Sequence, residues 1–135
     1  MTSQGWPPMQ RDGKSAEFFA AAEREELVIK GCNNCAQSLP PESAVCSRCG
    51  RTALSWLPAA GTATLISWTV VHRAPNGAYI ELVPYTVGII ELTEGPWLYG
   101  RIETDAPVAG MALKASFVHP EEGESYPLFV ESDGQ

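Results

Sequence analysis

Four cysteines carry the clearest chemistry in this sequence. They stand in two pairs, Cys32 with Cys35 and Cys46 with Cys49, and ten residues separate the pairs. Two cysteines three positions apart on a turn can direct both sulfur atoms at one ion, and backbone N–H groups of the turn donate hydrogen bonds to the thiolates. The spacing therefore predicts a tetrahedral metal centre with four thiolate ligands.

Two alternatives remain open for these cysteines. They can form disulfide bonds, as in many secreted domains, but the first thirty residues lack the basic start and apolar run of a signal peptide. Iron also accepts four thiolates in a tetrahedron, so the ligand set does not separate zinc from iron. We favour zinc because nothing else indicates electron transfer. Four protein ligands make such a site structural rather than catalytic.

The residues around the cysteines predict two tight turns with a reversal between them. Gly50 directly follows the second pair and eases the turn geometry, whereas Ala36 holds the equivalent position after the first pair and makes that turn less ideal. Pro40 and Pro41 lie in the spacer and can reverse the chain. The segment is too short to bury its own core, so we expect metal binding to hold it together.

The sequence shows no pattern of an independent enzyme. The two histidines, His72 and His119, stand at strand ends beside predicted turns, and no serine or threonine has a histidine and an acid at a recognisable spacing. No glycine-rich phosphate loop or dinucleotide fingerprint occurs. We therefore expect a chain that has no catalytic residues of its own.

Length and composition limit the class of protein. The chain has 135 residues, of which 44% are apolar, and no apolar run is long enough to span a membrane. The net charge of −7, from nine basic and sixteen acidic residues, opposes binding to polyphosphate backbones. We expect a soluble, cytoplasmic protein, and its acidic balance disfavours nucleic-acid binding.

An arm and a helix precede the cysteines. Proline and glycine make residues 1–14 an extended arm, in which Trp6 either folds back onto the domain or docks into a partner. A helix is expected over residues 16–25, with the preceding serine as its N-cap. Phe18 and Phe19 lie on one side of it, and this apolar side predicts a packing surface.

The rest of the chain has the residue pattern of strands. A short strand is expected over residues 27–29, and residues 56–61 read as a linker after the cysteine segment. Asn76-Gly77 is a strong reversal signal. β-Branched, aromatic and alternating residues predict five strands, over residues 62–72, 85–92, 97–103, 110–117 and 126–130.

Five strands with short turns and no helical crossover predict a small antiparallel barrel, most simply an OB-fold. The expected fold is thus mainly β, with a helical arm, a rubredoxin-like zinc ribbon and a five-stranded barrel. The predicted parts are the arm and helix over residues 1–30, the ribbon over residues 31–57 and the OB-fold domain over residues 58–135.

This order of parts resembles a family of bacterial and archaeal acyl-CoA-associated proteins. In that family a helical arm, a rubredoxin-like zinc ribbon and a C-terminal OB-fold follow one another. The family usually has a Gly-Arg pair where this chain has Ala59-Ala60. The matching features are Phe18-Phe19, the four cysteines with Pro40-Pro41 between them, Gly61-Thr62, the stretch over residues 84–92 with Gly95, and Gly110-Met111.

The resemblance implies a non-catalytic accessory subunit. Family members associate with thiolase-superfamily enzymes, among them thiolases and lipid-transfer-protein-like aldolases, or with hot-dog-fold enoyl-CoA hydratases. The arm and ribbon of such a subunit contact the partner, and the barrel helps to form the acyl-CoA pocket. Several partners act in the degradation of sterol side chains or aromatic acyl-CoA esters.

If the barrel touches coenzyme A, basic and aromatic side chains near one mouth are the candidates. Trp6, Phe18 and Phe19 are the candidate partner contacts. Nucleic-acid binding and independent hydrolysis remain as alternatives from other classes. The candidate acyl-CoA contacts are His72, Arg73, Tyr79, Tyr85, Arg101 and Lys114.

Overall fold

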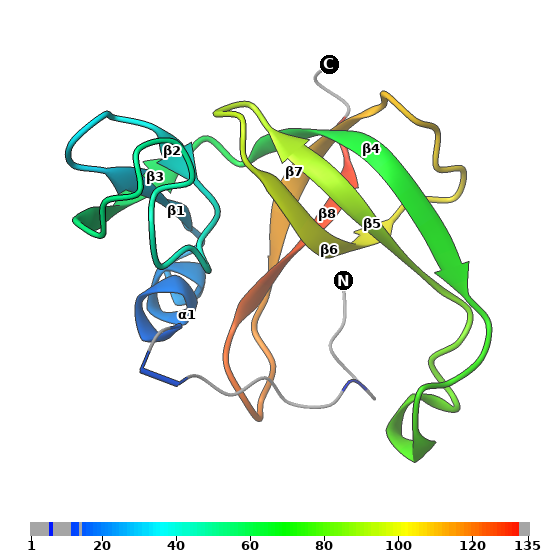
Figure 1. The fold of residues 1–135 in the computed structure, drawn as a ribbon. Helices are drawn as coiled ribbons and strands as arrows, with labels where there is room; N and C mark the ends of the chain where they lie inside the picture. Colours follow the sequence, from blue (N-terminus) through cyan, green and yellow to red (C-terminus); the bar gives the residue numbers. More distant parts are fainter. Residues whose placement is uncertain (1–5, 7–11, 14, 133–135) are drawn as a thin grey trace.

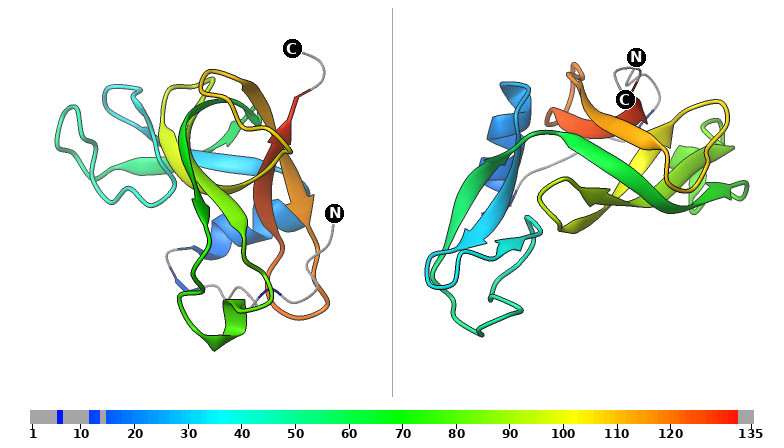
Figure 2. Two further views of the ribbon diagram at one scale, coloured as in Figure 1. Left: turned by 90° about the vertical axis from the view of Figure 1, so that its right-hand side faces the viewer. Right: turned by 90° about the horizontal axis from the view of Figure 1, so that it is seen from above.

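The structure, a computed structural model, describes residues 6, 12–13 and 15–132. It consists of a small ribbon lobe with one helix and a larger barrel lobe, and Figure 1 shows the two side by side. The ribbon strand β3 leads almost directly into the barrel strand β4, and this connection joins the lobes at an angle (Figure 2). Among the described residues, no helix is long and apolar enough to cross a membrane.

Helix α1 spans Ala16–Glu23 and is shorter than predicted. Ser15 is its N-cap residue, but its side chain makes no capping bond, because the hydroxyl donates to the Asp12 carboxylate instead. Phe18 and Phe19 are half-buried and meet edge-to-face with ring centroids 5.6 Å apart. The helix thereby packs against the β1 and β8 strands, as its apolar side predicted.

The ribbon sheet has three antiparallel strands in the order β2-β1-β3, namely Leu27–Cys32 (β1), Ser38–Leu39 (β2) and Leu54–Ala59 (β3). The prediction of a linker over residues 56–61 is wrong for its first four residues, because they belong to β3 and pair with β1 from Leu27 to Lys30. β3 also crosses the predicted boundary between residues 57 and 58. The pairing satisfies backbone groups that a free linker would leave to water.

The second lobe is a closed five-stranded barrel in the order β4-β5-β6-β8-β7, which confirms the predicted OB-fold class. The β6 and β8 strands run parallel, so the expectation of an antiparallel barrel throughout is corrected at this seam. The other four seams of this closed ring of five strands are antiparallel, so β6 and β8 must run in the same direction where the ring closes. The strands are Thr62–Val71 (β4), Tyr85–Leu92 (β5), Trp97–Glu103 (β6), Ala112–Val118 (β7) and Tyr126–Glu131 (β8).

The Asn76-Gly77 reversal is not a two-residue hairpin turn. A short 3-10 helix, η1, covers Gly77–Tyr79, and the Asn76 side chain accepts a hydrogen bond from the Ala78 N–H at 2.9 Å. The asparagine therefore acts as a helix cap instead of adopting the left-handed turn conformation. The connection between β4 and β5 covers residues 72–84, close to the interval that the predicted strands leave between them.

The two lobes share one hydrophobic core. Leu27 and Ile29 of β1 are buried in the same cluster as the barrel residues, and Phe18 of α1 packs against this cluster. The barrel contributes Ala63, Leu65, Ile90, Leu92, Ile102, Leu113 and Phe129. Ribbon and barrel are therefore not independent globules, because β1 is part of the barrel's packing as well as of the metal-binding segment.

Candidate functional site

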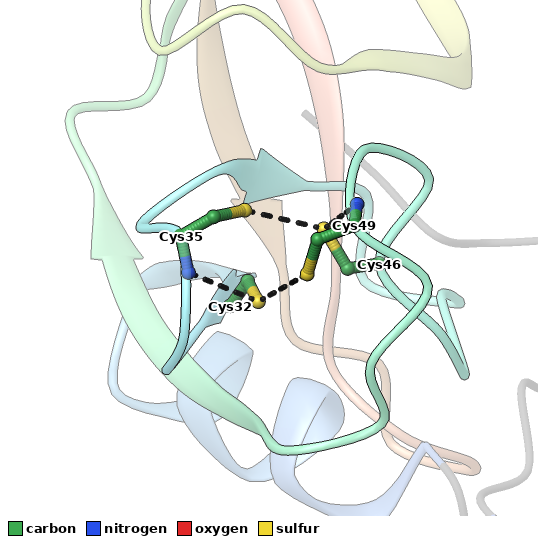
Figure 3. A group of neighbouring side chains, drawn as sticks. All are labelled: Cys32, Cys35, Cys46 and Cys49. Carbon is green, nitrogen blue, oxygen red and sulfur yellow. Dashed lines mark hydrogen bonds between the residues drawn. The ribbon is translucent and has the colours of Figure 1, made fainter.

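The four cysteine sulfur atoms converge at one point of the ribbon lobe, although the cysteines come from two separate turns (Figure 3). All four Sγ atoms lie within 4.8 Å of one another. Cys32 and Cys49 sulfurs are 3.6 Å apart, and so are those of Cys35 and Cys46. A disulfide requires about 2.05 Å, whereas a tetrahedron with metal–sulfur bonds of about 2.3 Å has edges of about 3.8 Å. The arrangement fits a four-thiolate metal centre.

The two turns repeat one hydrogen-bond pattern. The Cys32 sulfur accepts bonds from the N–H groups of Asn34 and Cys35 at 3.4 and 3.5 Å. The Cys46 sulfur accepts bonds from Arg48 and Cys49, both at 3.4 Å. These donors disperse negative charge on the first sulfur of each pair and fix its direction.

Backbone conformation at the ends of the turns supports the sequence interpretation. Ala36 has φ of 66° and Gly50 has φ of 79°, so both lie in the left-handed region. Each donates its N–H to the carbonyl of the first cysteine of its pair, at 2.9 Å for Ala36 and 2.8 Å for Gly50. Glycine adopts this conformation freely and alanine does not, which confirms that the first turn is the more strained one.

The turns also give the thiols different pKa values. The Cys49 N–H, followed by the Arg48 N–H, lowers the pKa of Cys46 to about 6, and the Cys35 N–H lowers the pKa of Cys32. The Gln37 N–H lowers the pKa of Cys35, but burial and its neighbouring thiols outweigh this and raise it to about 11. Cys46 is thus largely ionised at neutral pH, while Cys35 keeps its proton until a cation replaces it.

A second candidate site lies at the barrel, where three aromatic rings gather. Trp6 contacts Tyr79 and Tyr85 edge-on, with centroid distances of 6.1 and 5.1 Å. The Arg101 guanidinium carbon lies 3.9 Å from the Trp6 ring centroid. The structure therefore brings Tyr79, Tyr85 and Arg101 together as a group. Trp6 belongs to the same group, so its side chain packs on the barrel of the same chain.

Arg101 is poorly satisfied in this place. Its side chain is 11% exposed, and its Nε and Nη2 atoms are buried without a hydrogen-bond partner among the described residues. Glu103 lies 3.5 Å away, an ion-pair distance without good hydrogen-bond geometry. The arginine borders a cavity of about 600 Å³ that Asp105 and Glu131 also line. An unpaired buried donor of this kind costs about 1–3 kcal/mol, so a ligand oxygen that accepts from it would be stabilising.

The three other predicted contacts are exposed, and no interaction described in the structure joins them to this group. His72 and Arg73 are exposed just beyond the end of β4. Lys114 is exposed on β7, where it is paired with Thr62 at the other end of β4. A contact of any of these residues with coenzyme A stays a prediction.

One polar cluster was missed from the sequence. His119 is hydrogen-bonded through Nδ1 to the Ser125 hydroxyl and through Nε2 to the Glu25 carboxylate, both at 2.9 Å. The histidine and glutamate are 94 positions apart, so no local motif could indicate the pair. Their side chains are 42% and 65% exposed. The exposed position suits a surface link between the α1–β1 turn and the β7–β8 loop better than a nucleophile.

The comparisons match both lobes. A family model described as "ChsH2, rubredoxin-like zinc ribbon domain" matches residues 19–55. A second, described as "ChsH2, C-terminal OB-fold domain", matches residues 56–118. The two matches follow each other directly and together cover well over half of the chain.

Curated relatives agree with these matches. A "probable enoyl-CoA hydratase alpha subunit" of Thermomonospora curvata is 32% identical over 91% of this chain, but this chain spans only 38% of that protein. A "DUF35 domain-containing scaffold protein" of Methanocaldococcus jannaschii is 32% identical, with 70% of each chain covered.

A solved structure named "Ltp2-ChsH2(DUF35) aldolase" contains a similar chain. The likeness has a TM-score of 0.76 and 30% sequence identity, and it covers 90% of this chain and 96% of the other. Fold, cysteine geometry and sequence thus agree over both lobes. The chain belongs to the ChsH2 (DUF35) family, in which a rubredoxin-like zinc ribbon precedes an OB-fold domain.

Proposed function

We propose that this chain is a non-catalytic accessory subunit of an acyl-CoA enzyme with a thiolase-superfamily partner of the lipid-transfer-protein-like aldolase type. The observation that carries the proposal is the likeness of nearly the whole chain to a component of the Ltp2-ChsH2(DUF35) aldolase. The scaffold relative from Methanocaldococcus jannaschii supports the same class of role. In this role the partner supplies the nucleophile and the bases.

The metal of the ribbon is zinc in this proposal. Cys32, Cys35, Cys46 and Cys49 hold it, and the fit of their sulfur atoms to a tetrahedron supports a metal centre at this place. The match to a zinc ribbon family model supports zinc over iron. Zinc with four thiolates has no open position for substrate or water, so it supplies structural cross-linking and no reaction step. Binding of this kind contributes about 10–16 kcal/mol to zinc-dependent folds.

The barrel would contact the acyl-CoA with the group formed by Trp6, Tyr79, Tyr85 and Arg101. Aromatic faces accept a planar base, and a guanidinium with unused donors accepts an anionic oxygen. Carboxylates in the same cavity weaken the attraction for a highly charged phosphate. We therefore expect this contact to be modest by itself and to depend on the partner.

Partner contacts are proposed for exposed aromatic side chains. Trp97 is 52% exposed and Tyr99 is 85% exposed on β6. Successive residues of a strand point to opposite faces, so Trp97 and Tyr99 share the outer face of the barrel, while Leu98 between them packs against the core. Large exposed aromatics are typical of interface hot spots. Phe18 and Phe19, half-buried in the intramolecular packing, would support this surface from the helix.

Co-purification tests the proposal. The full-length chain is tagged in its native cells, and proteins that co-elute are identified by mass spectrometry. A thiolase-like protein recovered in comparable amount, whose turnover of acyl-CoA falls when this chain is omitted, is the expected result. Recovery of the chain alone, of nucleic acid, or of turnover by the isolated chain would contradict it.

A hydratase partner is the second candidate. The Thermomonospora curvata relative, a probable enoyl-CoA hydratase subunit, specifically favours it, although this chain corresponds to 38% of that protein. The same co-purification distinguishes the candidates, because a hot-dog-fold hydratase would be recovered instead of a thiolase-like protein.

A further inference from the structure

A second cavity lies between the two lobes, away from Arg101. Its volume is about 770 Å³, and its walls come from α1, the ribbon segment and the barrel strands β6 and β8. Small-molecule sites commonly have volumes of about 300–1,000 Å³ and occur between packed units. The apolar wall residues are Phe18, Phe19, Trp56, Leu98, Tyr99 and Phe129.

The backbone keeps the barrel side of this cavity open. Gly100 of β6 lines it, and a Cβ atom at this position would lie 3.2 Å from Cδ2 of Phe129. A side chain here would therefore press on the buried phenylalanine and occupy the space above it. The absence of a side chain lets an apolar group approach the Phe129 ring region closely.

The charges of the cavity oppose an anion. The charged side chains in its lining are Lys30, Asp12 and Glu42, which together carry a net negative charge. The Lys30 ammonium already donates to the Ser43 carbonyl oxygen at 2.8 Å and lies 4.8 Å from the Trp56 ring centroid. A carboxylate or phosphate would lose hydration here without a free cation in the lining to replace it. An uncharged apolar group meets no such cost.

We propose that this cavity binds the hydrocarbon part of an acyl thioester, with the coenzyme A portion outside. The inference rests on the proposed function and identifies a place for the substrate's acyl group. The lining of the cavity distinguishes the acyl thioester from the corresponding free acid. A thioester is neutral at its carbonyl, whereas the free acid is a charged carboxylate and is rejected. The cavity therefore retains the activated substrate in preference to the hydrolysed acid.

Calorimetric titration of the full-length, metal-loaded chain tests the proposal. The probes are hexanoyl-, octanoyl- and decanoyl-CoA, free coenzyme A, decanoate and decanol. Affinity is expected to rise by up to about fourfold for each added methylene, as burial of about 0.8 kcal/mol per methylene implies. Decanol is expected to bind more tightly than decanoate, and free coenzyme A least tightly.

A matched pair of variants locates the binding. Ala44 is exposed and lines the cavity, so Ala44→Phe places a ring in it. Ala109 is also exposed but lies in the turn between β6 and β7, outside the lining of both cavities, so Ala109→Phe adds the same ring elsewhere. Ala44→Phe is expected to lower decanoyl-CoA affinity at least tenfold with an unchanged melting temperature, and Ala109→Phe is expected to leave the affinity unchanged.

Three results would overturn the inference: affinity independent of chain length, equal effects of the two variants, or no binding by the isolated chain. Loss of partner co-purification in Ala44→Phe without chain-length-dependent binding would assign the cavity to a partner segment and would also overturn it. Different outcomes refute the proposed function and the cavity assignment. A partner that co-purifies with a chain that binds no acyl group refutes only the cavity assignment, and acyl binding without any partner refutes only the accessory role.

Discussion

Exchange of alanine and glycine between the two metal-binding turns should shift stability in opposite directions. Ala36 and Gly50 occupy the same place after their cysteine pairs, and both have positive φ. Both positions are exposed, and a Cβ atom at Gly50 meets nothing within 4 Å. Lost or gained packing therefore contributes little, and backbone conformation decides the outcome.

The magnitude follows from two terms. A left-handed conformation costs an ordinary L-residue about 1–2 kcal/mol, and glycine costs about 0.4–1 kcal/mol through the larger entropy of its unfolded chain. Ala36→Gly should therefore stabilise the native state by about 0.5–1 kcal/mol. Gly50→Ala should destabilise it by a similar amount, and the double variant should lie near the original chain.

Zinc affinity is the most direct assay, because metal binding and ordering of this segment are coupled. Competition against a chelator of known affinity should show zinc binding tightened about two- to fivefold in Ala36→Gly and weakened equally in Gly50→Ala. Ala44→Gly is the control, since Ala44 is exposed and has no positive φ, and it should only destabilise. The reasoning is refuted if Ala36→Gly weakens zinc binding, or if Gly50→Ala leaves it unchanged.

Further variants probe the metal, the barrel and the polar cluster. Cys46→Ser should abolish metal binding, measured by elemental analysis, and should disorder the cysteine turns in amide NMR spectra. Gly88→Ala should destabilise by about 2–4 kcal/mol in urea unfolding, because its Cβ would lie 2.8 Å from a β4 carbonyl oxygen; Gly77→Ala, with no atom within 4 Å, should be near neutral. Leu113→Ala should cost about 2–5 kcal/mol through a core cavity. His119→Ala should change the free energy of unfolding by less than about 1 kcal/mol, because the partners are exposed; a larger loss would show that the link to the α1–β1 turn is structural.

Local chemistry explains why much of this fold could be predicted. The strands over residues 85–92 and 97–103 have the predicted bounds, because turn residues mark their ends clearly. The metal centre was predictable for the same reason, since each cysteine pair is a local motif. Ala36 even showed in advance which turn carries the strain.

Non-local pairing explains which features of the fold could not be predicted from the sequence. Pro58 and Gly61 suggested a linker, but β1 lies opposite residues 56–59 and supplies partners for that backbone. The β6–β8 seam depends on residues far apart along the chain. The grouping of Trp6 with Arg101 likewise joins two residues that are 95 positions apart in a chain of 135, and no periodicity marks such a contact.

The shared core has a consequence for the chain as an evolutionary unit. Leu27 and Ile29 lie in the ribbon sheet but are buried with the barrel residues. A gene fusion or recombination that carried the barrel away from its own β1 strand would expose to water the apolar barrel residues that β1 covers. The two lobes should therefore be inherited together, and a ribbon borrowed from a relative should function only with the residues that match its host barrel at these two positions.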